Sequence, residues 1–296
     1  MTFFMDILKG LLIGVANIIP GVSGGTMAVS LGIYDKLIAA VSNLLKDWKS
    51  SFKTLFPLIL GCGIGIVGFT YVIEYLLSHH TFVTAMAFVG LILGGIPLLA
   101  ASLKKELRRS SSSVGISGVL AFVILFSVAA FLPMLNADEE VLRTFDVNAQ
   151  TLVCLFLVGV IASATMVVPG VSGSLVMMIL GYYYGIIETI KRFLDALKAF
   201  DMDGLLHGFA LLFPFGIGVL LGIFLIAKLI TFLFQRYGVQ TYCAILGLIV
   251  ASPFAIFYNT GALSDPASLS TWQIGLGLLL AALCGIVTVR MGKTTD

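Results

Sequence analysis

Pro20-Gly21-Val22-Ser23-Gly24-Gly25 lies inside a long apolar stretch near the N-terminus and returns in the second half of the chain as Pro169-Gly170-Val171-Ser172-Gly173-Ser174. Proline and glycine beside a small hydroxyl residue interrupt a helix and leave backbone polar groups without helical partners. At membrane depth such a break is tolerated only where it is buried in protein or lines a polar cavity. Two breaks at corresponding positions therefore indicate a transporter binding site.

The motif belongs to an internal duplication of the chain. The two copies start 149 residues apart, at Pro20 and Pro169, and eight of the fifteen positions from Pro20 to Tyr34 are identical in the second copy. The match resumes with Gly90-Leu91-Ile92 against Gly247-Leu248-Ile249, at an offset of 157, so the second copy carries eight additional residues after its motif. The sequence thus predicts two repeats, residues 1–140 and 141–296.

Composition indicates a polytopic membrane protein. Hydrophobic residues make up 59% of the chain, charged residues only 11%, and the mean hydropathy is +1.10, whereas charged residues are about 25% of a soluble domain. The first apolar stretch has no A-x-A cleavage site and continues into the motif, so we do not expect a removable signal peptide.

The expected fold is all-α, with two inverted repeats that each contain a broken or re-entrant helical hairpin and about three transmembrane helices. A span needs about 20 apolar residues, which predicts helices near 55–77, 82–102, 114–135, 209–234, 239–258 and 271–290. The motif regions, 7–40 and 151–190, are each expected to form two arms, as re-entrant hairpins or as pairs of tilted spans. Gly61 with Gly65, and Gly218 with Gly222, are expected to be helix-packing surfaces.

The distribution of basic residues predicts the orientation. If each repeat crosses the membrane an odd number of times, twelve fall on one side: Lys9, Lys36, Lys46, Lys49, Lys53, Lys104, Lys105, Arg108, Arg109, Arg236, Arg290 and Lys293. Four fall on the other side, with most of the acidic loop residues: Arg143, Lys191, Arg192 and Lys198. The positive-inside rule then places both termini in the cytoplasm. An odd count also makes the repeats inverted, so that the two turns can meet near the midplane, as alternating access requires.

The two turns are expected to bind an anion. A helix restarts after each turn, so its N-terminal N–H groups, the positive end of its dipole and a capping hydroxyl face the break. The expected binding residues are Asn17, Gly21, Ser23, Gly24, Gly25 and Thr26 in the first copy, and Gly170, Ser172, Gly173 and Ser174 in the second. Three cations are additional candidates: Lys228, which can instead reach the cytoplasmic interface, and Arg143 and Arg192 on the outer side. The alternative is that both turns are simple kinks filled by neighbouring helices.

Six ionisable residues are candidates for coupling transport to a proton or sodium ion. Asp35 and Glu188 are expected to end the two helices that follow the motifs, and Glu74 lies near the outer end of its span. His79, His80 and His207 are expected on the outer side, where an unperturbed imidazole would respond to pH because its pKa is about 6.5. Each of these residues is also explained as a helix cap or as a solvated interface residue.

The motif residues carry a family resemblance. Asn17-Ile18-Ile19-Pro20-Gly21-Val22-Ser23-Gly24-Gly25-Thr26-Met27-Ala28, followed by Leu31-Gly32-Ile33-Tyr34, together with the second copy, closely resemble the polyprenyl-phosphate transporter (PopT) family of bacteria and archaea, formerly a domain of unknown function. The resemblance extends over essentially the whole chain. It implies an undecaprenyl-phosphate translocase that returns the lipid carrier of cell-wall precursors from the outer to the inner leaflet of the cytoplasmic membrane. A phosphate monoester between two helix N-termini, with its tail in lipid, is compatible with the expected anion site.

Other functional classes find less support in the sequence. The four cysteines are isolated in apolar stretches, which favours core positions over metal or disulfide use. We find no catalytic, cofactor, nucleotide or metal motif, and a net charge of +2 gives no case for nucleic-acid binding. Two alternatives stay open: an integral-membrane polyprenyl-pyrophosphate phosphatase, although neither turn has an adjacent base in the sequence, and an ion-coupled transporter of a small soluble anion.

Overall fold

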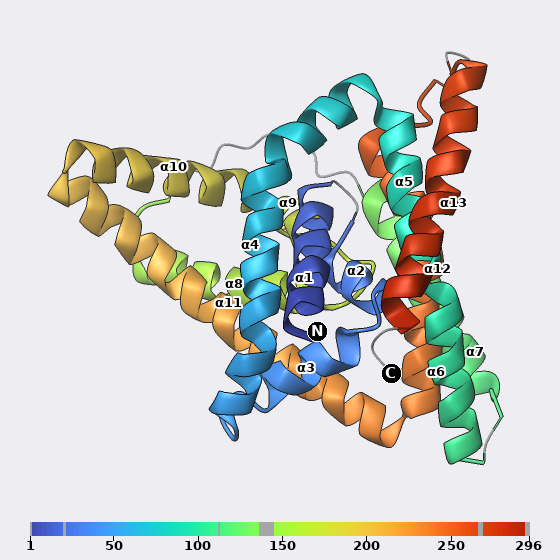
Figure 1. Ribbon diagram of the computed structural model, residues 1–296. Helices are drawn as coiled ribbons and strands as arrows, with labels where there is room; N and C mark the ends of the chain where they lie inside the picture. The colour runs from blue at the N-terminus through green and yellow to red at the C-terminus, as the bar shows by residue number, and fades with distance from the viewer. Residues whose placement is uncertain (1, 20–21, 112, 136–144, 266–268, 294–296) are drawn as a thin grey trace. The chain divides into compact units, whose positions relative to one another are not determined.

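The computed structural model describes residues 2–19, 22–111, 113–135, 145–265 and 269–293 (Figure 1). Within these residues the regular structure is entirely helical. In chain order the helices are α1 Thr2–Ile18, α2 Gly24–Ser30, α3 Tyr34–Ser42, α4 Trp48–His79, α5 Thr81–Leu93, α6 Ile96–Arg109, α7 Ile116–Phe131, the 3₁₀ helix η1 Leu132–Met134, α8 Ala149–Val167, α9 Gly173–Ile179, α10 Tyr183–Ala199, α11 Met202–Arg236, α12 Gly238–Thr260 and α13 Thr271–Lys293.

The six predicted spans are confirmed as helices. Among the described residues, seven segments are long and apolar enough to cross a membrane: α4, α5 with α6, α7 with η1, α8, α11, α12 and α13. The count reaches eight if α9 and α10, which are bent by 107° at their junction, form one broken span. The protein is therefore a multi-pass membrane protein.

Each motif region contains two breaks, where we expected one. The chain forms α1, α2 and α3 in the first copy and α8, α9 and α10 in the second. The additional break lies at Gly32 and at Gly181, which have φ angles of +69° and +73°. At both places the helix ends in a Schellman motif, since the N–H of the glycine and of the next residue bond back to the preceding turn. The seven residues of α2 and of α9 extend only about 10 Å each, so neither helix crosses the membrane alone.

The eight additional residues of the second copy lengthen one helix. α10 has 17 residues, whereas its counterpart α3 has 9. The expectation that Asp35 and Glu188 end these helices is wrong. Asp35 lies in the first turn of α3, and Glu188 lies inside α10, because the Schellman turn starts a new helix at Tyr34 and at Tyr183, ahead of both residues.

The structure divides into two compact units. Unit 1 comprises residues 1–134, 168–171 and 227–296, and unit 2 comprises residues 135–167 and 172–226. This division differs from the sequence repeats, because unit 1 contains α12 and α13 of the second copy.

Close glycine contacts hold equivalent helix pairs together in each unit. In unit 1, α4 packs along α1, and a Cβ at Gly61 or Gly65 would overlap the backbone carbonyl of Ile7 or Leu11 (Figure 1). In unit 2, a Cβ at Gly218 would overlap the carbonyl of Phe156 on α8 in the same manner. The predicted small-residue packing surfaces are therefore confirmed in both copies.

A second glycine contact pairs the repeats reciprocally inside unit 1. Gly90 on α5 lies against Ala281 on α13, and its sequence counterpart Gly247 on α12 lies against Phe122 on α7. α5 thus packs on α13, beside it in Figure 1, and α12 packs on α7. Each of these two contacts therefore joins a helix of one repeat to a helix of the other.

We predict that Gly61→Ala and Gly218→Ala destabilise the protein by about 1–3 kcal/mol, because the added methyl group has to push the paired helices apart. Gly63→Ala and Gly216→Ala are matched controls on the same helices, since a Cβ there meets no atom within 4 Å. Thermal unfolding of the purified protein measures the difference. Equal melting temperatures for the members of each pair would contradict the packing role.

Candidate functional site

The first break is capped by its own serine. Ser23 has an extended backbone at the N-cap of α2, and its Oγ accepts a hydrogen bond from the Thr26 N–H at 3.1 Å. The two hydroxyl groups lie 2.9 Å apart, and Ser23 and Thr26 are 6% and 1% exposed. The predicted capping role of Ser23 is therefore confirmed. Gly21 lies outside the described residues.

A second side chain caps the same helix end from the preceding helix. Asn17, near the end of α1, accepts a hydrogen bond through Oδ1 from the Gly24 N–H at 3.0 Å. The N–H groups of Gly24 and Thr26 thus have protein acceptors. An anion at this helix end has to use the N–H of Gly25, which lies between them, or displace one of the two caps.

The second break differs from the first in its capping. Ser172 occupies the N-cap position of α9, but its side chain makes no capping hydrogen bond. Its Oγ lies 2.8 Å from the Oγ of Ser174. The expectation that Ser172 caps its helix is wrong, because Ser174, at the position of Gly25 in the first copy, offers the hydroxyl a competing partner.

The two motif copies meet through a hydrogen bond in unit 1. The Gly170 N–H donates to Thr26 Oγ1 at 2.6 Å, across 144 residues of sequence. Gly170 has a φ of +78°, a conformation that glycine adopts without steric cost. Ser23, Thr26 and Gly170 therefore form one continuous chain of buried or half-buried polar groups.

The two glycines that begin α2 and α9 have little free space around them. A Cβ at Gly24 would lie 2.8 Å from Asn17 Nδ2, and a Cβ at Gly173 would overlap Met166 and approach the Ala162 carbonyl oxygen. Replacing either glycine by valine would thus disturb helix packing as well as any ligand. Substitutions of hydroxyl groups are therefore the better probes of binding.

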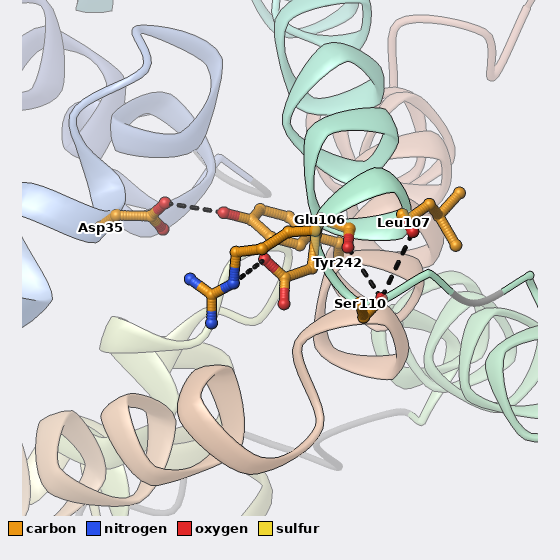
Figure 2. A network of polar contacts seen from close by, with 6 residues as sticks. Asp35, Glu106, Leu107, Ser110 and Tyr242 are labelled. Carbon is orange, nitrogen blue, oxygen red and sulfur yellow. Dashed lines mark hydrogen bonds and ion pairs between the residues drawn. The ribbon is translucent and has the colours of Figure 1, made fainter.

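A charged group at the start of α3 links the two repeats. Asp35 Oδ2 accepts a hydrogen bond of 3.0 Å from the Tyr242 hydroxyl on α12, and Glu106 on α6 pairs with Arg109 at 3.7 Å (Figure 2). Although Asp35 as a residue is exposed, the burial of its carboxyl raises the pKa, and the bond from Tyr242 partly offsets this effect. Sequence reasoning found Asp35 but missed its partners, which no local pattern reveals.

A second charged group lies between α1 and α3. Lys36 Nζ is 2.9 Å from Asp6 Oδ2, and the side chains are 41% and 12% exposed. Lys9, one turn along α1 from Asp6, is only 1% exposed. Lys9 was counted among the twelve basic residues of the predicted cytoplasmic side, but it lies within a helix in the protein interior.

Three further predicted residues meet in unit 2. Glu188 and Arg192 of α10 form an ion pair at 2.9 Å. Both line a pocket of about 670 Å³ between α10 and α11, together with His207. Asp195, Asp201 and Asp203 line the same pocket, so its acidic character argues against Arg192 as a docking point for an anion.

The remaining candidate residues that the structure describes lie on α4, on α11 and at the start of α5. His79 stacks on Tyr75 with ring centroids 4.4 Å apart, and His80 contacts the edge of Trp272. Glu74 is exposed on α4, and Lys228 is half-buried on α11. Arg143 lies outside the described residues.

Comparison with known proteins identifies the family. The profile of the VCA0040-like, undecaprenyl phosphate translocase-like family matches residues 13–274. The polyprenyl-phosphate transporter of Staphylococcus aureus (strain NCTC 8325 / PS 47) is 28% identical over 295 residues, which cover 99% of this chain and 97% of the relative. The polyprenyl-phosphate transporter of Vibrio cholerae serotype O1 (strain ATCC 39315 / El Tor Inaba N16961) is 28% identical over 267 residues, or 85% of this chain and 77% of the relative.

No solved structure matches the chain. Both relatives are named as transporters, in agreement with the prediction that the protein is not an enzyme. The family match covers most of the chain and includes both copies of the motif, so the chain belongs to the undecaprenyl phosphate translocase-like family.

Proposed function

We propose that this protein moves polyprenyl phosphate, in particular undecaprenyl phosphate, from the outer to the inner leaflet of the bacterial cytoplasmic membrane by alternating access. The observation that carries the proposal is the hydrogen bond from the Gly170 N–H to Thr26, which joins the two broken-helix motifs. Family membership and the names of the two relatives support the choice of lipid. A leaflet-resolved assay of undecaprenyl phosphate in liposomes tests it, and absence of protein-dependent movement would refute it.

The phosphate group is proposed to bind at the broken-helix ends. In the first copy its proposed donors are the hydroxyls of Ser23 and Thr26, the N–H of Gly25 and the amide of Asn17. The N–H of Gly24 becomes available when the phosphate displaces its Asn17 cap. In the second copy the proposed donors are the backbone of Gly170 and Gly173 and the hydroxyls of Ser172 and Ser174. A phosphate monoester carries about −1.5 to −2 charge near pH 7, which suits the positive ends of helices. Its polyprenyl tail stays in lipid.

A phosphatase is the less favoured alternative. The Ser23 hydroxyl is hydrogen-bonded to the backbone and hydroxyl of Thr26, and no histidine or carboxylate takes part in these bonds. A nucleophile needs an adjacent base. Release of phosphate from polyprenyl pyrophosphate by the purified protein would favour the phosphatase. A transporter of a small soluble anion would move inorganic phosphate without the lipid.

Thr26→Val is predicted to weaken transport strongly, because it keeps the shape of the side chain and leaves the Gly170 N–H without its acceptor. Loss of a buried hydrogen-bond partner costs about 1–3 kcal/mol of stability at the junction of the two motifs. Binding and transport of the lipid in liposomes measure the effect.

Thr26→Ser retains the hydroxyl and is expected to restore most of the activity. Thr288→Val is the matched control, since Thr288 is also fully buried and its hydroxyl bonds only within its own helix, to the Cys284 carbonyl. Transport by Thr26→Val at the rate of Thr288→Val would refute the site.

Asp35 is proposed to carry a coupling proton. Its carboxyl accepts a hydrogen bond from Tyr242 of α12. The same pocket is lined by Lys105, Glu106 and Arg109 of α6 and by Lys36 of α3, which is paired with Asp6. Burial already raises the pKa of this carboxyl, so it retains its proton to a higher pH than an exposed aspartate does.

Tyr242→Phe is predicted to shift the pH profile of transport to higher pH. The substitution removes the hydrogen bond that lowers the pKa of Asp35, so the carboxyl stays protonated over a wider range. Initial rates of transport between about pH 5 and 8 measure the shift. This pH range includes the second pKa of a phosphate monoester, which is near 6. Tyr258→Phe, on the same helix, is the control. If Asp35→Asn and Tyr242→Phe both retain the profile of the native protein, the pH dependence belongs to the lipid.

Both termini are proposed to lie in the cytoplasm. The support is the division of the basic residues, eleven against four once the interior Lys9 is left out. Single cysteines at Ser111 and Asp146 are then expected to react with an impermeant reagent from opposite sides of the membrane. Labelling of both from the same side would contradict this orientation and the inverted relation of the repeats.

A further inference from the structure

The pocket around Asp35 is built differently from the acidic pocket of unit 2. It has a volume of about 750 Å³ and lies among the α2–α3 turn, α3, α6 and α12, all in unit 1. Its charged side chains are Asp35, Lys36, Lys105, Glu106 and Arg109. Three cations and two carboxylates give this set a formal charge of +1, but Lys36 is already paired with Asp6 of α1.

The two carboxylates already have partners. The Tyr242 hydroxyl donates to Asp35, and the Arg109 guanidinium pairs with Glu106 through Nε (Figure 2). A guanidinium has five N–H donors, so this single contact leaves Arg109 able to bind another oxygen ligand. Among the described residues, no carboxylate lies within ion-pair distance of Lys105. The pocket therefore offers cationic donors to an anion.

The position of the pocket relates it to the broken helix. Val29 and Gly32 line it at the end of α2 opposite Ser23. Because α2 has seven residues, the pocket begins about 10 Å from the motif. Leu98 and Ile245 also line it, which provides an apolar surface beside the cations, as an amphipathic ligand requires.

We propose that this pocket is a second binding site for a phosphate monoester, distinct from the broken-helix ends, with Lys105 and Arg109 as its principal donors. The proposal rests on the proposed function, in which the polyprenyl phosphate headgroup passes from the motif to one side of the membrane. Inorganic phosphate has the same chemistry, and the experiment separates the two sources.

The basic residues of α6 have a second explanation that the test has to exclude. Cations near the C-terminus of a helix interact favourably with its dipole, and cytoplasmic loops are rich in them. Lys104 and Arg108 satisfy both conditions and are exposed, but they do not line the pocket. Lys104→Gln with Arg108→Gln is therefore matched in helix and charge to Lys105→Gln with Arg109→Gln.

The experiment measures the reaction of a cysteine in the pocket. Ser102→Cys lines the pocket, whereas Ser110→Cys lies just beyond the C-terminus of α6 and does not. Each variant of the full chain is treated with a water-soluble maleimide in the presence of geranylgeranyl phosphate, geranylgeraniol or inorganic phosphate. The chain without either substitution gives the background from its own four cysteines.

Geranylgeranyl phosphate is expected to slow labelling at position 102 and to leave position 110 unchanged. The Lys105 and Arg109 double variant is expected to lose roughly tenfold or more in apparent affinity, since each charge-assisted hydrogen bond is a strong one. The Lys104 and Arg108 double variant is expected to retain protection. Protection by the lipid alone identifies the headgroup as the ligand, and equal protection by inorganic phosphate identifies a site for soluble phosphate.

Three results would overturn the proposal. The first is protection by geranylgeraniol equal to that by the phosphate, and the second is equal loss of protection in the two double variants. The third is absence of protection in protein that transports the lipid, which would leave the proposed function intact. Absence of transport in the native protein would instead refute the proposed function.

Discussion

The need to satisfy backbone polar groups where a helix is interrupted in an apolar environment governs this structure. Such groups cannot form hydrogen bonds with water in the hydrocarbon core of a membrane. Each break therefore needs hydrogen-bond partners within the protein. In the first copy they come from Ser23, from Asn17 on the preceding helix, and, across the chain, from Thr26 to Gly170. The broken helix is thus held in place by the same hydroxyl and amide groups that give it a polar surface.

The surrounding helices supply the second requirement, which is close backbone packing. Lipid tails are as apolar as leucine, so membrane helices associate through tight contacts rather than through the hydrophobic effect. Gly61 and Gly218 provide these contacts for the helices that precede the two breaks, and Gly90 and Gly247 provide them between the repeats. The duplication therefore preserves the positions where backbones touch, although most side chains around them differ.

The sequence predicted what depends on local pattern. Length and hydropathy were sufficient to predict six spans. The motif was sufficient to predict the capping role of Ser23, because the capped N–H belongs to Thr26, only three residues away. The prediction that Ser172 caps its helix was wrong because of one local difference between the copies. Ser174 stands where the first copy has Gly25, and its hydroxyl pairs with that of Ser172. The second break in each copy was not predicted, although Gly32 and Gly181 occupy equivalent positions of the repeats. The presence of a glycine does not by itself show that its φ angle is positive. The partners of Asp35 and of Gly170 lie 207 and 144 residues away, beyond any periodic signal.

The helix α2 connects these features. Its first turn holds Thr26, and its last residue, Ser30, donates a hydrogen bond of 3.2 Å to the Ile92 carbonyl of α5. Beyond it the Schellman turn at Gly32 leads directly to Asp35 and its bond with Tyr242. The short helix α2 thus carries a hydrogen-bonded contact to another part of the chain at each of its ends. It places the Thr26–Gly170 hydrogen bond and the charged pocket at Asp35 about two helical turns apart.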